Sequence, residues 1–482
     1  FKELGNKNPN WKLEPDQRDE FPYWIGSGSD FRTFVVIPKR RRDLAVWLKT
    51  HPEPDHWRED DWRDRCRTNF ATISCTLYEL SLEGVWPVSR WSEALQVWSD
   101  DRNLLRSWRR LGSVLLKADQ SVLKELSSSI GWWMQALGKK VDPNDFLFFD
   151  FTKKILTLNS EDTPSQDDLT SAAINHPIGL VTEALLRAWY RTSPSDGDLL
   201  SGEFKVIFST LCEPSIDGYR YGRHLLSTHL ISLFRVDPEW TEKFLLPYFD
   251  WVKSIQEARS SWQGFLWSPR FYGPLFEVLG ATFLKTSQHY LLLDRLGSQY
   301  AGLLTYVALE HSEFLSSQGL ANATRALPHD GLREAAHALV NALDGSGDQH
   351  AVYWANRVVP YLQKIWPKSS ANISPEIADQ LAQVCIAAKD EFPSAYSLLQ
   401  PWLQALKRPD YVVHRLKESD VCANFPKVAL DYLSIVIGET LRWPPTELRN
   451  CLAQIREAEP MLEKTDQYRR LQDYLRAHRE EG

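Results

Sequence analysis

The sequence predicts an all-α protein, an α-solenoid-like array of helical hairpins or bundles that follows a short irregular N-terminal segment. Three observations support this fold class. Apolar residues recur at helical spacing, helix starts and stops are clearly marked, and strand-like alternation is almost absent beyond residue 70. Many medium-length helices joined by short loops over 482 residues favour a stack of helices over one ordinary core. We expect three parts, residues 1–70, 71–290 and 291–482.

Residues 1–70 are the expected irregular lead-in. They are rich in Pro, Asp, Arg and aromatic residues and are interrupted by Gly26-Ser27-Gly28-Ser29. One β-like run, Phe34 to Ile37, precedes the basic cluster Lys39-Arg40-Arg41-Arg42. The chain starts at Phe1 without an initiator Met or a signal peptide, so we interpret it as part of a longer protein and this segment as the junction to an upstream domain.

Residues 71–290 carry recurrent helical patterns. Trp91, Leu95 and Trp98 fall at positions i, i+4 and i+7 of one helix. Asp237-Pro238-Glu239 combines an N-cap residue, a proline in the first turn and an acid that suits the helix dipole. Ser193-Pro194-Ser195-Asp196-Gly197 is a predicted break between helices.

Residues 291–482 continue the helical pattern. Ser374-Pro375-Glu376 is a second predicted helix start, followed by an apolar stripe that includes Ile377 and Leu381. The segments around Pro360 and Pro401 share a Pro-aromatic-apolar core and lie roughly 40 residues apart, as in two-helix HEAT-like units. A similar segment at Pro247 does not fit this period, so repetition and chance similarity explain the echo equally well.

Composition excludes several functional classes. The formal net charge is −7 and the isoelectric point about 6.0, so no global basic field attracts nucleic acid, which is therefore not an expected partner. The apolar runs are too short to span a membrane. The six cysteines are scattered without a CxxC pair, which argues against a zinc site or a disulfide framework and favours a reducing cytoplasm.

Tryptophan is unusually frequent, with 20 residues in the chain. Most should belong to the core, because an indole removes a large apolar area from water and needs only one hydrogen-bond partner. A few exposed ones would be recognition anchors, since Trp is enriched at binding hot spots. Trp251, Trp262 and Trp267 share a stretch broken by Ala258-Arg259-Ser260-Ser261, which can leave an indole exposed, so we take these three as candidate partner-binding residues.

Patterns that support catalysis are largely missing. The sequence has no P-loop, Rossmann fingerprint, HExxH or GxSxG motif, so we expect no catalytic, cofactor-binding or metal-binding residue in this chain. His224 and His229 are five residues apart and are predicted to be ordinary helical histidines on different faces. The loop from His51 to His56 is interpreted as a solvated turn, and the basic cluster at 39–42 as a solvated face or a salt-bridge network.

The most distinctive segment is Ala172-Ala173-Ile174-Asn175-His176-Pro177-Ile178-Gly179-Leu180. It predicts a helix start in which Asn175 or His176 is the cap, Pro177 fixes the first turn, and Gly179 lets another backbone approach. A structural cap is the simpler interpretation. The functional alternative makes Asn175 and His176 a polar contact point for a partner.

That segment resembles an uncharacterised helical domain at the C-terminus of bacterial defence-associated sirtuins, which are sirtuin-headed antiphage proteins. The resemblance spans about residues 20–285. It also rests on Tyr219 to Arg235, on Asp237 to Trp251, on Ser261 to Trp267, and on Val85-Trp86-Pro87 with the segment Arg90 to Trp98.

The resemblance implies a division of labour. An N-terminal sirtuin-like domain, absent from this sequence, would degrade NAD, and this helical part would be the non-catalytic sensor that controls it. The implied partners are a phage structural protein such as a tail component and the protein's own N-terminal domain, and homo-oligomerisation stays open. Two alternatives are a generic helical-repeat adaptor for cellular proteins and a cryptic hydrolase. A deep cleft with clustered acids or histidines of perturbed pKa would favour the hydrolase.

Overall fold

The computed structural model describes residues 35–54, 59–100, 102–165, 168–369, 373–438 and 443–477. These residues form an all-α protein without a β-strand among them. The only β-type pairing within these ranges is a single parallel bridge between Val35 and Asp60. The β-like run predicted to begin at Phe34 is therefore no strand over its described part. Within the same ranges, no helix has both the length and the apolar character needed to cross a membrane.

The chain divides into two compact units, Phe1–Val97 and Trp98–Gly482. The first unit contains α2, α3, α4 and the start of α5, with bounds Arg41–Thr50, Trp62–Thr68, Phe70–Leu82 and Val88–Ser99. Helix therefore begins inside the segment that we expected to be irregular. The reason is an apolar stripe in α2, where Leu44 and Leu48 are fully buried against α4 despite the neighbouring basic cluster.

The basic cluster is a helix start in this unit. Lys39 and Arg40 precede α2, and Arg41 pairs with Glu79 of α4 at 3.0 Å between Nη2 and Oε1. Both side chains of this pair remain about half exposed, so it contributes little stability. The loop from His51 to His56 lies partly outside the described residues.

A buried arginine organises the polar part of the first unit. Arg90 of α5 is 2% exposed and contacts the Asp60 carboxylate at 2.7 Å. It also donates hydrogen bonds to the carbonyl oxygens of His51 and Glu53 and lies over the ring of Trp47. One side chain thus ties the loop after α2 to Asp60 at the start of α3.

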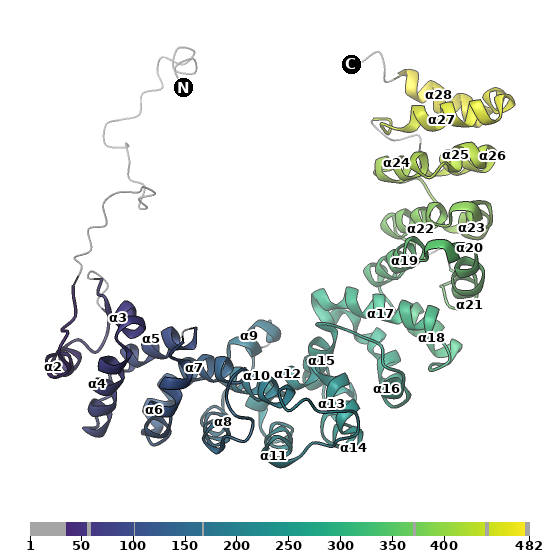
Figure 1. The fold of residues 1–482 in the computed structure, drawn as a ribbon. Coiled ribbons are helices and arrows are strands. Elements are labelled where there is room, and N and C mark those ends of the chain that lie inside the picture. The colour runs from purple at the N-terminus through teal and green to yellow at the C-terminus, as the bar shows by residue number, and fades with distance from the viewer. Residues whose placement is uncertain are drawn as a thin grey trace, which may run out of the picture. The chain divides into compact units, whose positions relative to one another are not determined.

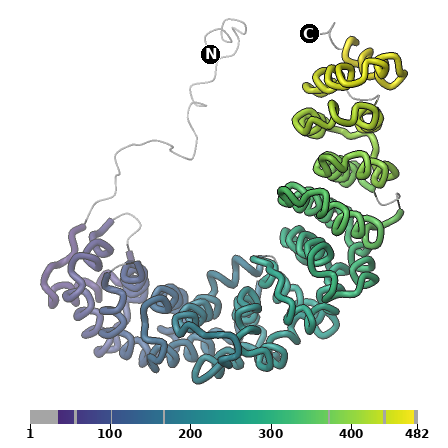
Figure 2. Tube along the Cα trace, turned by 45° about the vertical axis from the view of Figure 1, so that its right-hand side comes forward, coloured from purple at the N-terminus to yellow at the C-terminus, as the bar shows by residue number. Residues whose placement is uncertain are grey.

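The second unit is a succession of packed helices (Figures 1 and 2). Its first part contains α6 Leu104–Leu116, α7 Gln120–Leu137, α8 Phe146–Leu158, α9 Leu169–Asn175, α10 Pro177–Tyr190, α11 Gly202–Leu211, α12 Arg220–Thr228, α13 Leu230–Val236, α14 Pro238–Trp240, α15 Ile255–Leu266, α16 Gly273–Lys285 and α17 Gly297–Glu310. The most extensive packing here joins α7 with α10 and α12 with α15.

The remaining helices continue this arrangement. They are α18 Ser317–Arg325, α19 His329–Asp344, α20 His350–Tyr353, α21 Val359–Lys364, α22 Pro375–Ala387, α23 Phe392–Leu399, α24 Asp410–Glu418, α25 Val421–Asn424, α26 Pro426–Val436, α27 Leu448–Ala458 and α28 Asp466–Ala477. Helix α19 packs on both α17 and α22, and α24 packs on both α22 and α27. Each helix thus contacts mainly neighbours in sequence, which is the packing expected of a helical array.

The predicted helix starts are confirmed at atomic level. The side chain of Asp237 accepts a hydrogen bond from the amide of Trp240 at 2.9 Å, and Ser374 accepts one from Ile377 at 3.3 Å. Gly179 also has the predicted role, since a Cβ atom there would lie 1.7 Å from the carbonyl oxygen of Ala173. Only glycine lets α10 begin this close to α9.

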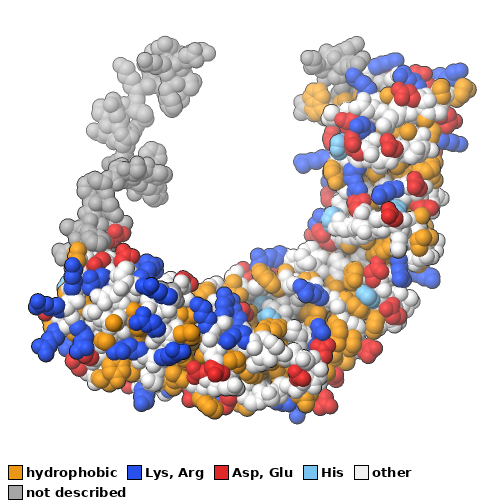
Figure 3. Space-filling view, viewed as in Figure 1, with side chains coloured by type: hydrophobic (Ala, Val, Ile, Leu, Met, Phe, Trp, Pro, Cys, Tyr) orange, Lys and Arg blue, Asp and Glu red, His pale blue; other side chains and the backbone are white. Residues whose placement is uncertain are grey.

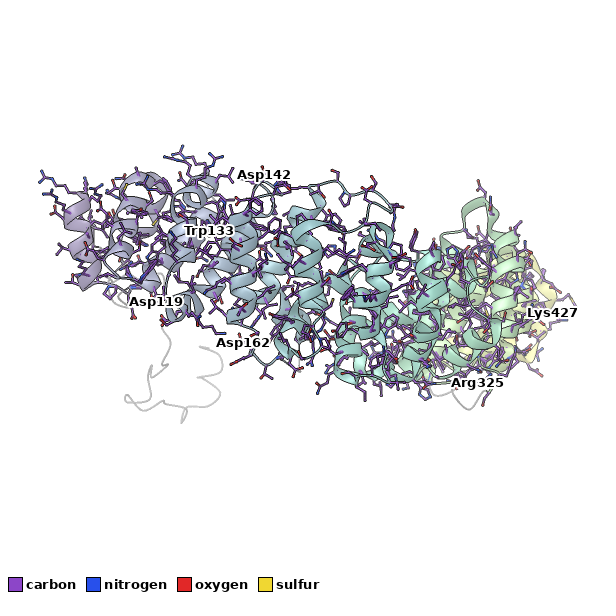
Figure 4. All side chains as sticks on the ribbon, turned by 90° about the horizontal axis from the view of Figure 1, so that it is seen from below. Asp119, Trp133, Asp142, Asp162, Arg325 and Lys427 are labelled. Atoms are coloured by element: carbon purple, nitrogen blue, oxygen red, sulfur yellow. The ribbon has the colours of Figure 1, made fainter. Side chains whose placement is uncertain are left out.

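Most tryptophans are core residues, as predicted. Trp133 of α7 is fully buried and lies among the helices in Figure 4, and its Nε1 donates to the Ser107 hydroxyl at 3.0 Å. It packs against Trp108, whose Nε1 donates to the Asp145 carboxylate at 2.8 Å. A side-chain partner thus satisfies each indole N–H while the ring fills the core.

Candidate partner-binding cleft

A cleft of about 580 Å³ opens between α9, α10, α12, α13 and α15 of the second unit. Basic and histidine side chains lie beside hydrophobic ones on the visible face over α10, α12 and α15 (Figure 3). Helix α10 presents Glu183, Arg187 and Tyr190 to the cleft because positions i, i+4 and i+7 share one helix face. The segment after α15, Trp267 to Arg270, forms one rim.

Three arginines line this cleft, and their partners differ. Arg187 donates from Nε to Glu183 at 2.8 Å and from Nη1 to the carbonyl oxygen of Gln135. Arg235 contacts Asp196 at 3.0 Å. Arg270 is exposed and makes no hydrogen bond or ion pair with any residue that the structure describes. The cleft wall therefore offers one guanidinium whose five N–H donors are free for an incoming anion.

His224 supplies an acceptor at the wall of the same cleft. Its Nδ1 lies 2.9 Å from the carbonyl oxygen of Ser260, and a carbonyl can only accept, so Nδ1 carries the proton. Nε2 is then a bare acceptor, and it has no hydrogen-bond partner among the described residues although it is fully buried. Burial lowers the pKa of His224 to about 4, so the ring is neutral at physiological pH.

His229 belongs to a short hydrogen-bonded chain. Its Nδ1 lies 2.8 Å from the hydroxyl of Tyr190, which also interacts with the side chain of Ser232. Burial lowers the pKa of His229 and raises the pKa of Tyr190, which favours the neutral form of both groups. The Tyr190 hydroxyl can donate to Nδ1 or accept from it, according to the tautomer of the His229 ring.

Trp267 gives the cleft an aromatic rim. It follows the last residue of α15 and is 52% exposed, whereas most tryptophans of the chain are buried. The guanidinium of Arg295 lies 5.5 Å from the centre of its ring. A partly exposed indole held between a helix end and a cation leaves one face available for a ligand.

The other two candidate tryptophans are buried, which argues against their role as exposed anchors. Trp251 is 4% exposed, stacks on His289 and donates from Nε1 to the Thr286 hydroxyl at 2.9 Å. Trp262 is fully buried and donates to the carbonyl oxygen of Phe249 at 3.0 Å. Of the three candidate tryptophans, Trp267 is therefore the one that is exposed.

Asn175 and His176 lie at the corner between α9 and α10 and do not line the cleft. Asn175 is exposed and donates from Nδ2 to the carbonyl oxygen of Ser171 at 2.8 Å. His176 is the N-cap of α10, accepts from the amide of Ile178, and reaches Asp162 at 3.1 Å. Asp162 lies at one edge of the helices in Figure 4. The observed contacts therefore match the structural cap, the simpler of the two interpretations.

Sequence reasoning missed the residues that make this cleft polar, namely Arg187, Tyr190, Arg235 and Arg270. It also predicted, from their helical spacing, that His224 and His229 lie on different helix faces. That argument fails because α12 ends at Thr228 and His229 caps both α12 and α13, outside regular helical geometry. The helix break turns both histidines toward one cleft. A histidine directly after a predicted helix end was the signal that could have shown this.

No candidate metal centre, meaning a group of three or more His, Cys, Asp or Glu side chains, is present in the described segments. All six cysteines lie in those segments, and none of them forms a disulfide. Comparison of the chain with protein families, curated proteins and solved structures finds no match.

Proposed function

We propose that this chain is a non-catalytic recognition scaffold that binds a partner protein at the cleft bordered by Trp267. The observation that carries this proposal is the half-exposed Trp267 indole beside the unpaired Arg270 guanidinium. Trp and Arg dominate binding hot spots because a large planar surface and a fork of donors can both be desolvated by a partner. The helical array supports this role, since such arrays present extended binding surfaces.

The defence context of the proposal rests on the sequence resemblance. In that context the partner is a phage structural protein such as a tail component, and its binding would control a sirtuin-like domain that degrades NAD. The scaffold would act in the cytoplasm and bind no cofactor itself. A generic adaptor for cellular proteins would use the same cleft, so the identity of the bound protein separates these two functions.

Clustered histidines and Tyr190 in the cleft also favour the alternative of a cryptic hydrolase. A hydrolase of the triad type needs a nucleophile that is hydrogen-bonded to an imidazole base. The contacts of the two histidines differ from this arrangement. Nδ1 of His224 meets a backbone carbonyl, and His229 meets a tyrosine whose pKa is raised by burial. Glu183 is engaged by Arg187. Recognition is therefore better supported than hydrolysis.

The binding proposal is tested by pull-down and calorimetry of the chain with a panel of phage structural proteins. Trp267→Ala should weaken the binding of a captured protein by about 2 kcal/mol or more, which is roughly 30-fold in Kd. Trp443→Ala is the matched control, because Trp443 is also more than half exposed but lies outside the cleft. Neutralising Arg40, Arg41 and Arg42 should change affinity little at physiological salt.

Unchanged binding in Trp267→Ala together with loss in the Arg40, Arg41 and Arg42 variant would move the site to the first unit. The chain itself should not consume NAD, with or without the captured protein. NAD loss that follows the purified chain would contradict the non-catalytic role.

A further inference from the structure

Two residues that line the Trp267 cleft each carry a polar group without a described partner, one a donor and the other an acceptor. The Arg270 guanidinium donates to no described residue, and the Nε2 lone pair of His224 accepts from none. A buried acceptor without a partner costs free energy, and a donor that reaches it recovers that cost. A ligand that carries an anion next to an N–H group would satisfy both sites.

The charge of the cleft lining favours a ligand with an anionic group. Its lining contains three arginines and a single carboxylate, Glu183, which pairs with Arg187. Arg235 pairs with Asp196 outside the lining, so Arg270 is the lining arginine that has no described anionic partner. This contrasts with the whole chain, whose formal net charge is −7. The positive field is therefore local to the cleft, which suits one acidic group and not a long polyanion.

The arrangement of two neighbouring clefts favours an extended ligand. Arg270 also lines a neighbouring cleft of about 630 Å³, whose wall includes Phe271 and Tyr306. Arg270 therefore borders both clefts, with Trp267 in the first and two aromatic rings in the second. A polypeptide segment with alternating acidic and apolar side chains can run through both, whereas a small anion would fill only the junction.

The geometry points to a binding site for an acidic-apolar segment of the partner protein in these joined clefts. An Asp or Glu side chain of that segment pairs with Arg270, and a neighbouring apolar side chain packs on Trp267. A backbone N–H of the segment donates to Nε2 of His224 once the side chains that cover this buried atom move aside. This inference rests on the proposed binding function and specifies the chemistry of the segment that the scaffold recognises.

The test uses fluorescein-labelled peptides and anisotropy with the full chain. The acidic probe contains Asp-Leu-Glu-Leu-Asp, and its neutral counterpart contains Asn-Leu-Gln-Leu-Asn. Binding of the acidic probe should be at least about tenfold tighter and should weaken as salt rises. Equal binding of both peptides would overturn the inference, and so would tighter binding of a labelled oligothymidine or displacement of the acidic probe by millimolar inorganic phosphate.

Variants locate the site. Arg270→Gln should weaken the acidic probe about tenfold and leave the neutral probe unchanged, because it removes the charge at an exposed position. Arg408→Gln is the matched control, since Arg408 is also exposed and has no hydrogen bond or ion pair to a described residue, but lies in a distant loop. His224→Asn can keep a donor toward Ser260 while it removes the Nε2 acceptor, and should weaken both probes. Melting temperatures of all variants check the fold.

Two outcomes separate this inference from the proposed function. If a captured phage protein is lost in Trp267→Ala but binds Arg270→Gln and His224→Asn like the unchanged chain, the scaffold function stands and the acidic-segment inference fails. If that protein binds all three variants equally well, both the proposed function of the cleft and the inference fail.

Discussion

Nδ1 of His224 in α12 donates a hydrogen bond to the carbonyl oxygen of Ser260 in α15 at 2.9 Å. This contact joins two helices that pack extensively on each other and fixes the tautomer of a fully buried imidazole. The ring must stay neutral there, because a charge would be desolvated on all sides. Burial is the largest influence on the pKa of His224 and lowers it, while the hydrogen bond to Ser260 and the charge of Asp168 act in the opposite direction.

Stability should therefore fall in mild acid. The pKa of His224 is about 4 in the folded chain against 6.5 in its ordinary state, so between these values the unfolded chain binds a proton that the folded chain does not. The free energy of unfolding should decrease as pH falls through this window, by roughly 3 kcal/mol in total. Urea unfolding between pH 7.5 and 4.5 measures the slope, which should be smaller in His224→Asn. Equal slopes in both proteins would contradict the assignment.

Loss of the Asp60 carboxylate should strongly destabilise the first unit. Asp60→Asn leaves the Arg90 guanidinium, only 2% exposed, without its shortest anionic contact. Breaking a buried ion pair in this way costs about 3–5 kcal/mol. The control is Lys49→Gln, which removes an exposed pair with Glu83 and should cost less than about 1 kcal/mol. Denaturant unfolding compares the two variants, and similar midpoints would show that Arg90 finds other partners.

The junction of α9 and α10 should not tolerate a side chain at Gly179. An alanine Cβ would meet the Ala173 carbonyl oxygen at 1.7 Å, so the two helices must separate. We expect Gly179→Ala to cost about 3 kcal/mol or more. Gly302→Ala in α17 is the control, because no atom lies within 4 Å of its Cβ position, and it should stabilise the helix by roughly 0.5–1 kcal/mol. Thermal unfolding gives both values.

The tryptophans after Asp250 should divide into two classes. Trp262→Ala removes a fully buried ring and should cost about 3–5 kcal/mol. Trp267→Ala changes a half-exposed residue whose ring lies beside the Arg295 guanidinium, and should cost less than about 1 kcal/mol. Denaturant midpoints of the two variants test this. A large loss in Trp267→Ala would mean that the residue is structural and that its binding phenotype needs another variant.

Local sequence signals predicted the helices well because they depend on neighbouring residues. Asp237, Ser374 and His176 cap the helices that follow them, and the apolar stripe from Ile377 to Leu381 is buried. The start of α2 was missed because the polar residues around Arg41 hide the two leucines of its buried stripe. A high density of charged residues is a weak predictor of irregular structure, because a long arginine side chain can reach solvent from the edge of a packed helix.

The sequence by itself determined the all-helical class, the caps and the glycine that lets α10 approach α9, since each follows from spacing and backbone geometry within a few residues. Only the tertiary structure decided which tryptophan is exposed and which polar residues meet. Trp262 and Trp267 look alike in sequence, but one lies inside α15 and the other just beyond its end. Arg187, His224 and Arg270 come together because α10, α12 and the segment after α15 pack around one cleft. Such contacts depend on helix packing between distant positions, which no local pattern encodes.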